Sequence, residues 1–389
     1  MRRHKPADSQ VATIREGPTM NHVTSIGLDV HARSVHAAAF NPITGEVATK
    51  RFGVSPSELT EWISSFDSPK AVYESGVTGF HLARELRSLG VDCVVGAVSK
   101  MMKPAADKAR KNDRNDAVFL ARMLAANNIV EVMVPDEECE SMRDLSRLLE
   151  DARDDLARAK QRLTKFLLRH GHVFDERRAD GRLKGNWTRD HWAWIRRIEF
   201  AQSADQDVFD AYISEVRHFE AHKKAIEGRI KKRAAEERWR SRVEALRCLK
   251  GIDTVTAFAI VVEAQVFSRF DNASAFAAWL GLVPSEHSSG GSSRKGGITK
   301  SGNSHLRRLL VEAAWHYANA TPKRKERAAG PGIVPLPIEN HAAKGTKRLV
   351  ERRRLLSSCG KKPAVANVAT ARELAGWCWA IGRMCEGTL

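Results

Sequence analysis

The stretch that decides the fold is residues 25–36, S-I-G-L-D-V-H-A-R-S-V-H. Apolar Ile26, Leu28 and Val30 alternate with small or polar residues, and this period of two predicts a short buried strand. Asp29 lies near the middle of that strand. A buried carboxylate is costly without a compensating charge, so Asp29 requires a cationic partner or a metal ion. The alternative is an edge strand on which Asp29 faces water, and acids further along the chain favour the first interpretation.

The segments that follow predict a layered α/β domain. Strand-like stretches at 35–40, 47–54, 70–74 and 91–95 alternate with helix-like stretches at 57–65 and 80–89. A turn-forming Asn-Pro-Ile-Thr-Gly sequence joins the second and third strands, which suits a hairpin. Three strands in a meander, followed by strand–helix–strand, form an α/β sheet. This is also the order of elements expected of a ribonuclease-H-like domain.

Four acids in this domain are candidates for one metal site. Asp29 lies in the first strand and Glu74 ends the fourth, while Asp113 and Asp116 lie three apart in a helical region, 104–124. If the first and fourth strands are neighbours, the four carboxylates converge at one sheet edge. Clustered oxygen donors favour Mg²⁺ or Mn²⁺, and two ions about 3.5–4 Å apart can hold the attacking and leaving oxygens of a phosphodiester. For the helical pair alone, a solvated acidic face is the alternative.

Charge and composition indicate a folded protein that binds nucleic acid. The 389 residues include 64 Lys+Arg against 47 Asp+Glu, which gives a net charge of +17. Basic residues recur in every segment, so nucleic acid is favoured over a generic basic surface or an acidic membrane. The length predicts two or three domains, and 42% hydrophobic residues suit packed cores.

Cysteine usage and hydropathy predict a soluble protein of a reducing cytoplasm. The six cysteines are scattered without a C-x-x-C pair, so neither a zinc site nor a disulfide framework is expected. No apolar run approaches the roughly 20 residues that span a bilayer. Residues 1–22 are polar, unlike a signal peptide, and are predicted to be a disordered lead-in.

The middle of the chain, 134–245, predicts a helical arm. Apolar residues recur at threes and fours among many charges over two stretches, the second covering 208–246. Two long helices in an antiparallel pair or coiled coil are expected, for self-association or for spacing two modules. Between them, residues 177–197 are rich in Arg, Gly and Trp. These Trp rings either stack on nucleotides or plug the end of the helical pair, and the sequence leaves both open.

The last part, 246–389, predicts a mostly helical domain. Residues 246–264 have the pattern of a helix-hairpin-helix, in which the turn at Gly251 can present backbone N–H groups to a phosphate. An ordinary helix–turn–helix connection is an equal alternative. Residues 321–345 contain four prolines and are expected to be an irregular connector, and 346–384 are again helical.

An unusual Ser/Gly-rich loop is expected at 284–303. It carries Arg294 and Lys300, and the basic helix predicted at 304–320 has Arg307 and Arg308 in its first turn. Such a composition is typical of a flexible linker. However, glycines allow backbone to approach a phosphate, and a helix start behind them favours anions. A serine hydroxyl held there could attack a phosphodiester.

Taken together, these segments resemble the DEDD-type insertion-sequence transposases of the one-ten family. The resemblance is carried by I-G-L-D-V-H (26–31), A-V-Y-E-S-G-V-T-G (71–79), K-N-D-R-N-D-A (111–117), L-K-G-I-D (249–253) and S-S-G-G-S-S-R-K-G-G-I-T-K-S-G-N-S-H-L-R-R-L-L (288–310). Each motif is weak alone, and their order and combination are specific.

The resemblance implies a RuvC-like ribonuclease-H fold and a site made by two domains. The positions that match the DEDD acids are Asp29, Glu74, Asp113 and Asp116. It implies a serine nucleophile that forms a covalent link to DNA, for which Ser289 is the matching position, with Ser288 as its neighbour. It also implies that sites from different subunits of a dimer or tetramer meet in a composite active site, and that a structured RNA encoded by the element pairs with donor and target DNA.

The expected organisation is a lead-in (1–22), a DEDD domain (23–133), the helical arm (134–245) and a C-terminal transposase domain (246–389). The expected function is cutting and rejoining DNA on the bacterial nucleoid with Mg²⁺ or Mn²⁺. One alternative is a metal-dependent Holliday-junction-type nuclease without a covalent serine intermediate. A second alternative is a structural protein that binds nucleic acid without cutting it.

Overall fold

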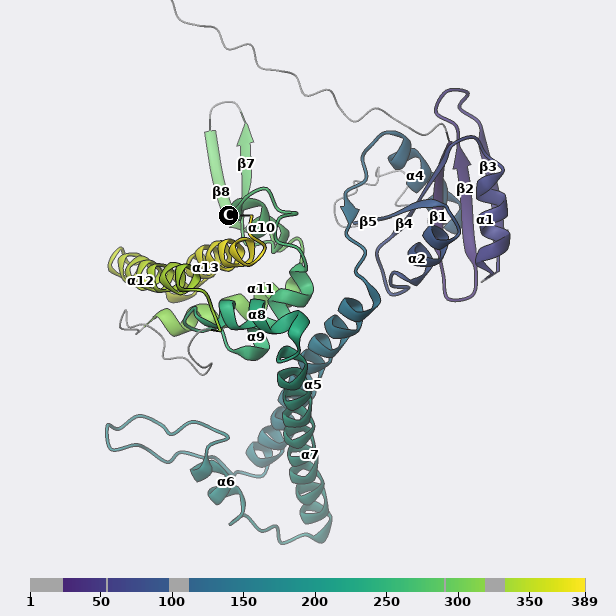
Figure 1. Cartoon of the computed structure of the whole chain (residues 1–389). Coiled ribbons are helices and arrows are strands. Elements are labelled where there is room, and N and C mark those ends of the chain that lie inside the picture. Colours follow the sequence, from purple (N-terminus) through teal and green to yellow (C-terminus); the bar gives the residue numbers. More distant parts are fainter. Residues whose placement is uncertain (1–23, 54, 98–111, 290–291, 319–332, 389) are drawn as a thin grey trace, which may run out of the picture. The chain divides into compact units, whose positions relative to one another are not determined.

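The computed structural model describes residues 24–53, 55–97, 112–289, 292–318 and 333–388, and gives only the backbone of 287–289 and 292–295 (Figure 1). The chain divides into two compact units, 1–135 and 136–389. The lead-in expected at 1–22, the first part of the helical region expected from residue 104 and much of the connector expected from residue 321 lie outside the described residues.

The first unit is built on a six-stranded mixed sheet in the order β3-β2-β1-β4-β5-β6. Its strands are β1 (Thr24–Val30), β2 (Val35–Phe40), β3 (Val47–Phe52), β4 (Pro69–Glu74), β5 (Asp92–Gly96) and β6 (Glu131–Val132). The first three strands form an antiparallel meander, and β4 lies parallel to both β1 and β5. The meander and the strand–helix–strand order therefore follow the sequence prediction. Asp29 is the second-last residue of β1 rather than its middle.

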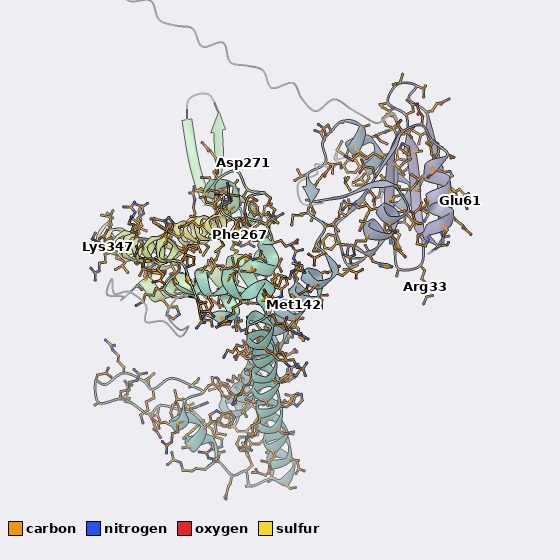
Figure 2. All side chains as sticks on the ribbon, viewed as in Figure 1. Arg33, Glu61, Met142, Phe267, Asp271 and Lys347 are labelled. Carbon is orange, nitrogen blue, oxygen red and sulfur yellow. The ribbon has the colours of Figure 1, made fainter. Side chains whose placement is uncertain are left out.

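Helices cover both faces of this sheet. The helices α1 (Pro56–Ser64) and α2 (His81–Ser88) pack on the face that carries the alternate apolar residues of the strands, such as Leu28. The opposite face carries α4 (Asp113–Ala125), which packs on Val72 of β4. Exposed residues such as Arg33, between β1 and β2, and Glu61 on α1 lie on the outside of the unit (Figure 2).

Gly27 allows α4 to pack directly against the backbone of β1. A Cβ at position 27 would lie 2.0 Å from the carbonyl oxygen of Ala117 and 2.5 Å from the amide nitrogen of Ala121. Because helix backbone cannot yield as a side chain can, we expect Gly27→Ala to lower the free energy of unfolding by about 1–3 kcal/mol. Denaturant titration followed by circular dichroism measures this loss. Gly53→Ala is the control, since a Cβ there meets nothing within 4 Å; equal losses in both variants would contradict the expectation.

The second unit begins with an antiparallel pair of long helices, α5 (Glu137–Arg169) and α7 (Ser203–Ala234). The start of α5 shares a core with the end of α7, whereas its second half packs against the first half of α7. The stretch predicted as one helix over 208–246 is divided, because α8 (Glu237–Arg247) starts anew after α7. This break lets Trp239 turn into the C-terminal core, where its ring meets that of Phe258.

The Trp-rich segment between α5 and α7 packs on the end of the helical pair. Its short helix, α6 (Arg189–Ile195), buries His191, whose ring stacks on Trp194. The ring of Trp187 lies beneath the Lys160 ammonium group of α5, with 4.8 Å between Nζ and the ring centroid. These Trp side chains belong to the hydrophobic cluster between α5 and α7. Of the two alternatives left open by the sequence, the structure therefore shows the second, in which the Trp side chains pack against the end of the helical pair.

The rest of the second unit is a helical core that carries a β-hairpin. Its elements are α8, α9 (Thr254–Ala264), α10 (Ala273–Trp279), β7 (Pro284–Ser289), β8 (Ser292–Ile298), α11 (Ser304–Ala314), the 3₁₀ turn η2 (Trp315–Tyr317), α12 (Leu336–Ser358) and α13 (Pro363–Cys385). Met142 of α5 and Phe267, which follows α9, are buried in its largest hydrophobic cluster (Figure 2).

Four further predictions for this unit need correction. The loop expected at 284–303 contains the hairpin β7–β8, because its two halves pair across the glycines at 290–291. The connector expected to reach residue 345 ends earlier, since α12 starts at 336. Proline is compatible with the first turn of a helix, where its missing N–H has no partner to lose. The helical stretch expected at 346–384 is divided between α12 and α13, and α11 ends at Ala314 rather than continuing to 320.

Candidate active site

Asp29 and Glu74 lie at the same level on the same face of the sheet. Strands β1 and β4 are parallel with Leu28 opposite Tyr73, so the residues that follow each of these occupy neighbouring positions. Leu28 and Tyr73 are buried in the core on the α1 and α2 side. Because successive side chains of a strand alternate between faces, Asp29 and Glu74 face the side that α4 covers. The condition set by the sequence, that the first and fourth strands be neighbours, is met.

The start of α4 brings Asp113 over Asp29. Ala117 and Ala121 lie above Gly27, so the helix crosses β1 at that point. Asp113 lies four residues before Ala117, which is about 6 Å along the helix axis. Asp29 lies two residues after Gly27, which is about 6.6 Å along the strand. The antiparallel course of α4 over β1 therefore places Asp113 level with Asp29.

Two histidines join these acids, and neither was predicted as a site residue. The Nε2 atom of His31 lies 3.1 Å from Oδ2 of Asp29 and 3.5 Å from Oδ2 of Asp113. His36 pairs with Asp29 across the β1–β2 hairpin, and its Nε2 lies 3.8 Å from the same Asp113 oxygen. The signal in the sequence is D-x-H: His31 comes directly after the end of β1, two residues from Asp29, and its ring reaches the Asp29 carboxylate. The hairpin register that brings in His36 is not visible in the sequence.

The electrostatics of this cluster favour a cation. Burial raises the pKa of Asp29 above its usual range, and the charges of Asp113 and Asp116 raise it further, while His31 opposes them. When its carboxylates are ionised, the cluster therefore carries more negative charge than its neighbours offset. One ligand atom each from Asp29, His31 and Asp113 lie within 4.8 Å of one another. Two carboxylates and an imidazole fit a divalent cation, and the ring nitrogen suits Mn²⁺ better than Mg²⁺. Glu74, on the same sheet face, would add a further oxygen donor.

Ser289 lies at the end of β7, next to the tip of the hairpin. In the backbone register Ser289 pairs with Ser292, and Ser288 pairs with Ser293. The acids belong to the unit 1–135, whereas this hairpin belongs to the unit 136–389.

The root of the hairpin is tightly fixed to the helical core. Gly302 has a φ of 120°, and a Cβ there would lie 2.0 Å from the Trp279 carbonyl oxygen. The guanidinium group of Arg307 donates a hydrogen bond to the Leu280 carbonyl at 2.9 Å. Beneath them, the buried Glu263 accepts hydrogen bonds from Arg147 of α5 and from the Asn303 side chain. This network was not predicted, because it joins α5, α9 and α11 from distant parts of the sequence.

Three of the other residues predicted to bind nucleic acid make contacts within the protein, and the remaining two are Lys300 and Arg294. Gly251 has a φ of +81°, and a Cβ there would lie 2.5 Å from the carbonyl oxygen of Ala313, so this glycine lets its turn pack on α11. Arg308 donates to Glu150 and Glu312, and Arg307 donates to the hairpin root; both guanidinium groups thus have protein partners. Lys300 is exposed, and the side chain of Arg294 lies outside the described part of the structure.

Sequence comparisons identify the family. A profile described as "Transposase IS116/IS110/IS902 family" matches residues 243–329, and a DEDD transposase profile of the IS110 type matches residues 26–171. The chain is 34% identical to y4qE of Sinorhizobium fredii, a protein named as a transposase, over 88% of this chain and 83% of that protein. It is 30% identical to the transposase for insertion sequence element IS1533 of Leptospira borgpetersenii, over 88% of this chain and 99% of the relative. The chain belongs to the IS110 family of transposases.

A transposase of this family is an enzyme that cleaves DNA and transfers strands. The alternative of a structural protein that binds nucleic acid without cutting it is therefore wrong. The basic net charge of +17 is consistent with DNA as the substrate. Among helices within the described ranges, none is both long enough and apolar enough to cross a bilayer.

Proposed function

We propose that this transposase mobilises its insertion sequence with a metal site in the first unit and a serine nucleophile in the second. Asp29, Glu74, Asp113 and Asp116 hold one or two divalent cations, Mg²⁺ or Mn²⁺, on the α4 side of a RuvC-like ribonuclease-H fold. The observation that carries the proposal is the meeting of Asp29 and Asp113 at His31, within the part matched by the DEDD transposase profile.

The acids and the serine have different tasks. A divalent cation held by these acids would neutralise charge on the phosphate and stabilise the leaving oxygen. Asp29 and Asp113 would hold this cation, and the His31 ring at their meeting point would complete the ligand set. The Oγ of Ser289, or of Ser288 in its place, attacks the phosphorus. As the Oγ–P bond forms, the serine hydroxyl gives up its proton, the bond from phosphorus to one sugar oxygen breaks, and that oxygen takes up a proton.

Rejoining reverses this step. A sugar hydroxyl of the second DNA strand attacks the serine-linked phosphorus, forms a new phosphodiester and returns the proton to the serine oxygen. Each bond broken is replaced by an equivalent bond, so no external energy source is needed. Because the acids and Ser289 lie in different units, sites completed between subunits of a dimer or tetramer fit this scheme. The α5–α7 pair, proposed as a coiled-coil arm, offers a surface for that assembly.

We assign recognition of the DNA to a structured RNA and to the C-terminal part of the chain. We propose that a structured RNA encoded by the element pairs with donor and target DNA on the nucleoid. The segment from α8 to α9, proposed as a helix-hairpin-helix, contacts the DNA backbone near Gly251. Arg294 of the hairpin contacts phosphates near the scissile bond, Lys300 contacts phosphates at the hairpin root, and Arg307 and Arg308 support the surface around Lys300.

The proposal is tested with the purified protein, DNA that carries both element ends, RNA transcribed from the element's flanking sequence, and Mg²⁺ or Mn²⁺. We expect rejoined strands and a protein–DNA adduct that survives denaturing electrophoresis, both lost with a chelator and both reduced without the RNA. Metal-dependent cleavage without any adduct would favour the junction nuclease. No cleavage with any RNA or metal would overturn the proposal.

A further inference from the structure

A large cavity lies at the root of the serine hairpin. It encloses about 1140 Å³ between the root of β7 and β8, α10, α12 and α13. Small-molecule pockets measure about 300–1,000 Å³, so this cavity has room for more than one aromatic group. The hairpin contributes Pro284 and Ile298, and Val365 of α13 lines the cavity although 56% of its surface is exposed. The transposase thus keeps an open apolar surface at the root of the hairpin that carries its proposed nucleophile.

The walls of this cavity suit flat rings. Trp377 and Trp379 of α13 line it, and on the hairpin side Gly296 and Gly297 contribute no side chain between Pro284 and Ile298. His341 adds a polar group, since its buried Nε2 has no hydrogen-bond partner among the described residues. Burial and the nearby Lys344 lower the pKa of His341, which keeps the ring neutral near pH 7. A neutral imidazole nitrogen can pair with a base edge.

Charge around the cavity favours a polyanion. Among its described lining residues the cations are Lys300, Arg352 and Arg372, and the acid is Glu373. Glu373 is already engaged, because its oxygens lie 3.1 Å from Nε of Arg348 and 3.8 Å from Nε of Arg352. An apolar peptide would gain little from this positive rim, whereas a nucleic-acid strand would place phosphates on it and bases inside.

The cavity is also within reach of the strand that Ser289 attacks. Ser289 lies five residues after Pro284 in β7, which is about 17 Å along the hairpin. One DNA strand rises about 3.4 Å per nucleotide when stacked, so this length corresponds to roughly five nucleotides. We propose that the cavity binds unpaired bases of the cleaved DNA strand, within about five nucleotides of the scissile phosphate. This inference rests on the proposed role of Ser289.

Val365→Glu tests the cavity without touching the catalytic groups. Val365 lies in the first turn of α13, where a carboxylate is compatible with the helix dipole, so the variant should fold. A charge there would oppose both stacking and phosphate binding. Leu355→Glu is the matched control, since Leu355 of α12 is 53% exposed and is not among the lining residues. Thermal melting of the two variants verifies that both are folded.

The probe is a fluorescein-labelled 12-nucleotide oligothymidylate, with a 12-base-pair duplex and a 12-nucleotide oligouridylate as comparisons. Fluorescence anisotropy is measured on the full chain with chelator present, so cleavage and the serine chemistry play no part. We expect Val365→Glu to weaken oligothymidylate binding by about tenfold, with duplex binding unchanged and Leu355→Glu equal to wild type.

Three results would overturn the inference. The first is an equal loss of affinity for duplex and single strand in Val365→Glu, and the second is a loss of affinity confined to the oligouridylate. The third is an unchanged affinity for oligothymidylate together with an altered oligomeric state in sedimentation. The last would assign the cavity to a second copy of the chain. Because no adduct is scored, failure here is distinct from failure of the serine mechanism, which the strand-transfer assay detects.

Discussion

Asp29→Asn should abolish DNA cleavage while the folded protein remains at least as stable as wild type. The change removes one charged donor from the proposed metal site and keeps the shape of the side chain. Loss of metal-based stabilisation of the leaving oxygen amounts to several kcal/mol, so we expect about a thousandfold loss of cleavage rate. The rate is measured on labelled DNA carrying the element ends, under saturating Mg²⁺ or Mn²⁺.

The stability part of this expectation follows from the raised pKa of Asp29. Burial and the charges of Asp113 and Asp116 disfavour the ionised carboxylate in the folded state. Above the unfolded pKa this costs stability, so removing the charge at neutral pH should raise the melting temperature slightly in metal-free buffer. Adding metal should raise the melting temperature of wild type more than that of the variant.

Asp92→Asn provides the matched control for this variant. Asp92 starts β5 in the same sheet, its side chain is 65% exposed, and its oxygen lies 3.8 Å from Nζ of Lys70. We expect cleavage and the response to metal to equal those of wild type. Cleavage retained in Asp29→Asn would remove this carboxylate from the active site. An equal loss in both variants would indicate a general effect of charge.

The first unit could be predicted from the sequence because its signals are local. Alternation over residues 25–36 predicts which side chains of β1 face the α1 and α2 core, and turn residues predict the meander. The convergence of Asp29 and Glu74 needed one further fact, that β1 and β4 are neighbours. His31 and His36 were missed, because their approach to Asp113 depends on hairpin register and on the crossing point of α4 at Gly27.

The second unit was harder to predict because its decisive contacts are non-local. Ser and Gly have low strand preference, so 284–303 looked like a loop, and only pairing across the glycines makes it a hairpin. Arg307 and Arg308 looked available for phosphate, whereas the structure gives them protein partners. The ion pair of Glu263 with Arg147 joins residues 116 positions apart. The pattern of charged residues in the sequence shows that a charged side chain needs a partner, but it does not show which residue that partner is.

Ser289→Ala should remove the covalent protein–DNA adduct and lower strand transfer by about a thousandfold or more, as expected for loss of a nucleophile. DNA binding should be unchanged, because one hydroxyl contributes little beside the many basic residues. The adduct is measured by denaturing electrophoresis of labelled DNA, and binding by fluorescence anisotropy with chelator present.

Ser288→Ala is the control, one residue earlier in β7. If this variant loses the adduct while Ser289→Ala keeps it, the nucleophile lies one residue earlier and the rest of the scheme stands. If wild type cleaves DNA but neither serine is ever linked to it, the metal site acts alone. The hairpin would then serve to hold DNA, and the fixed root formed by Gly302 and Arg307 would position a phosphate rather than a nucleophile.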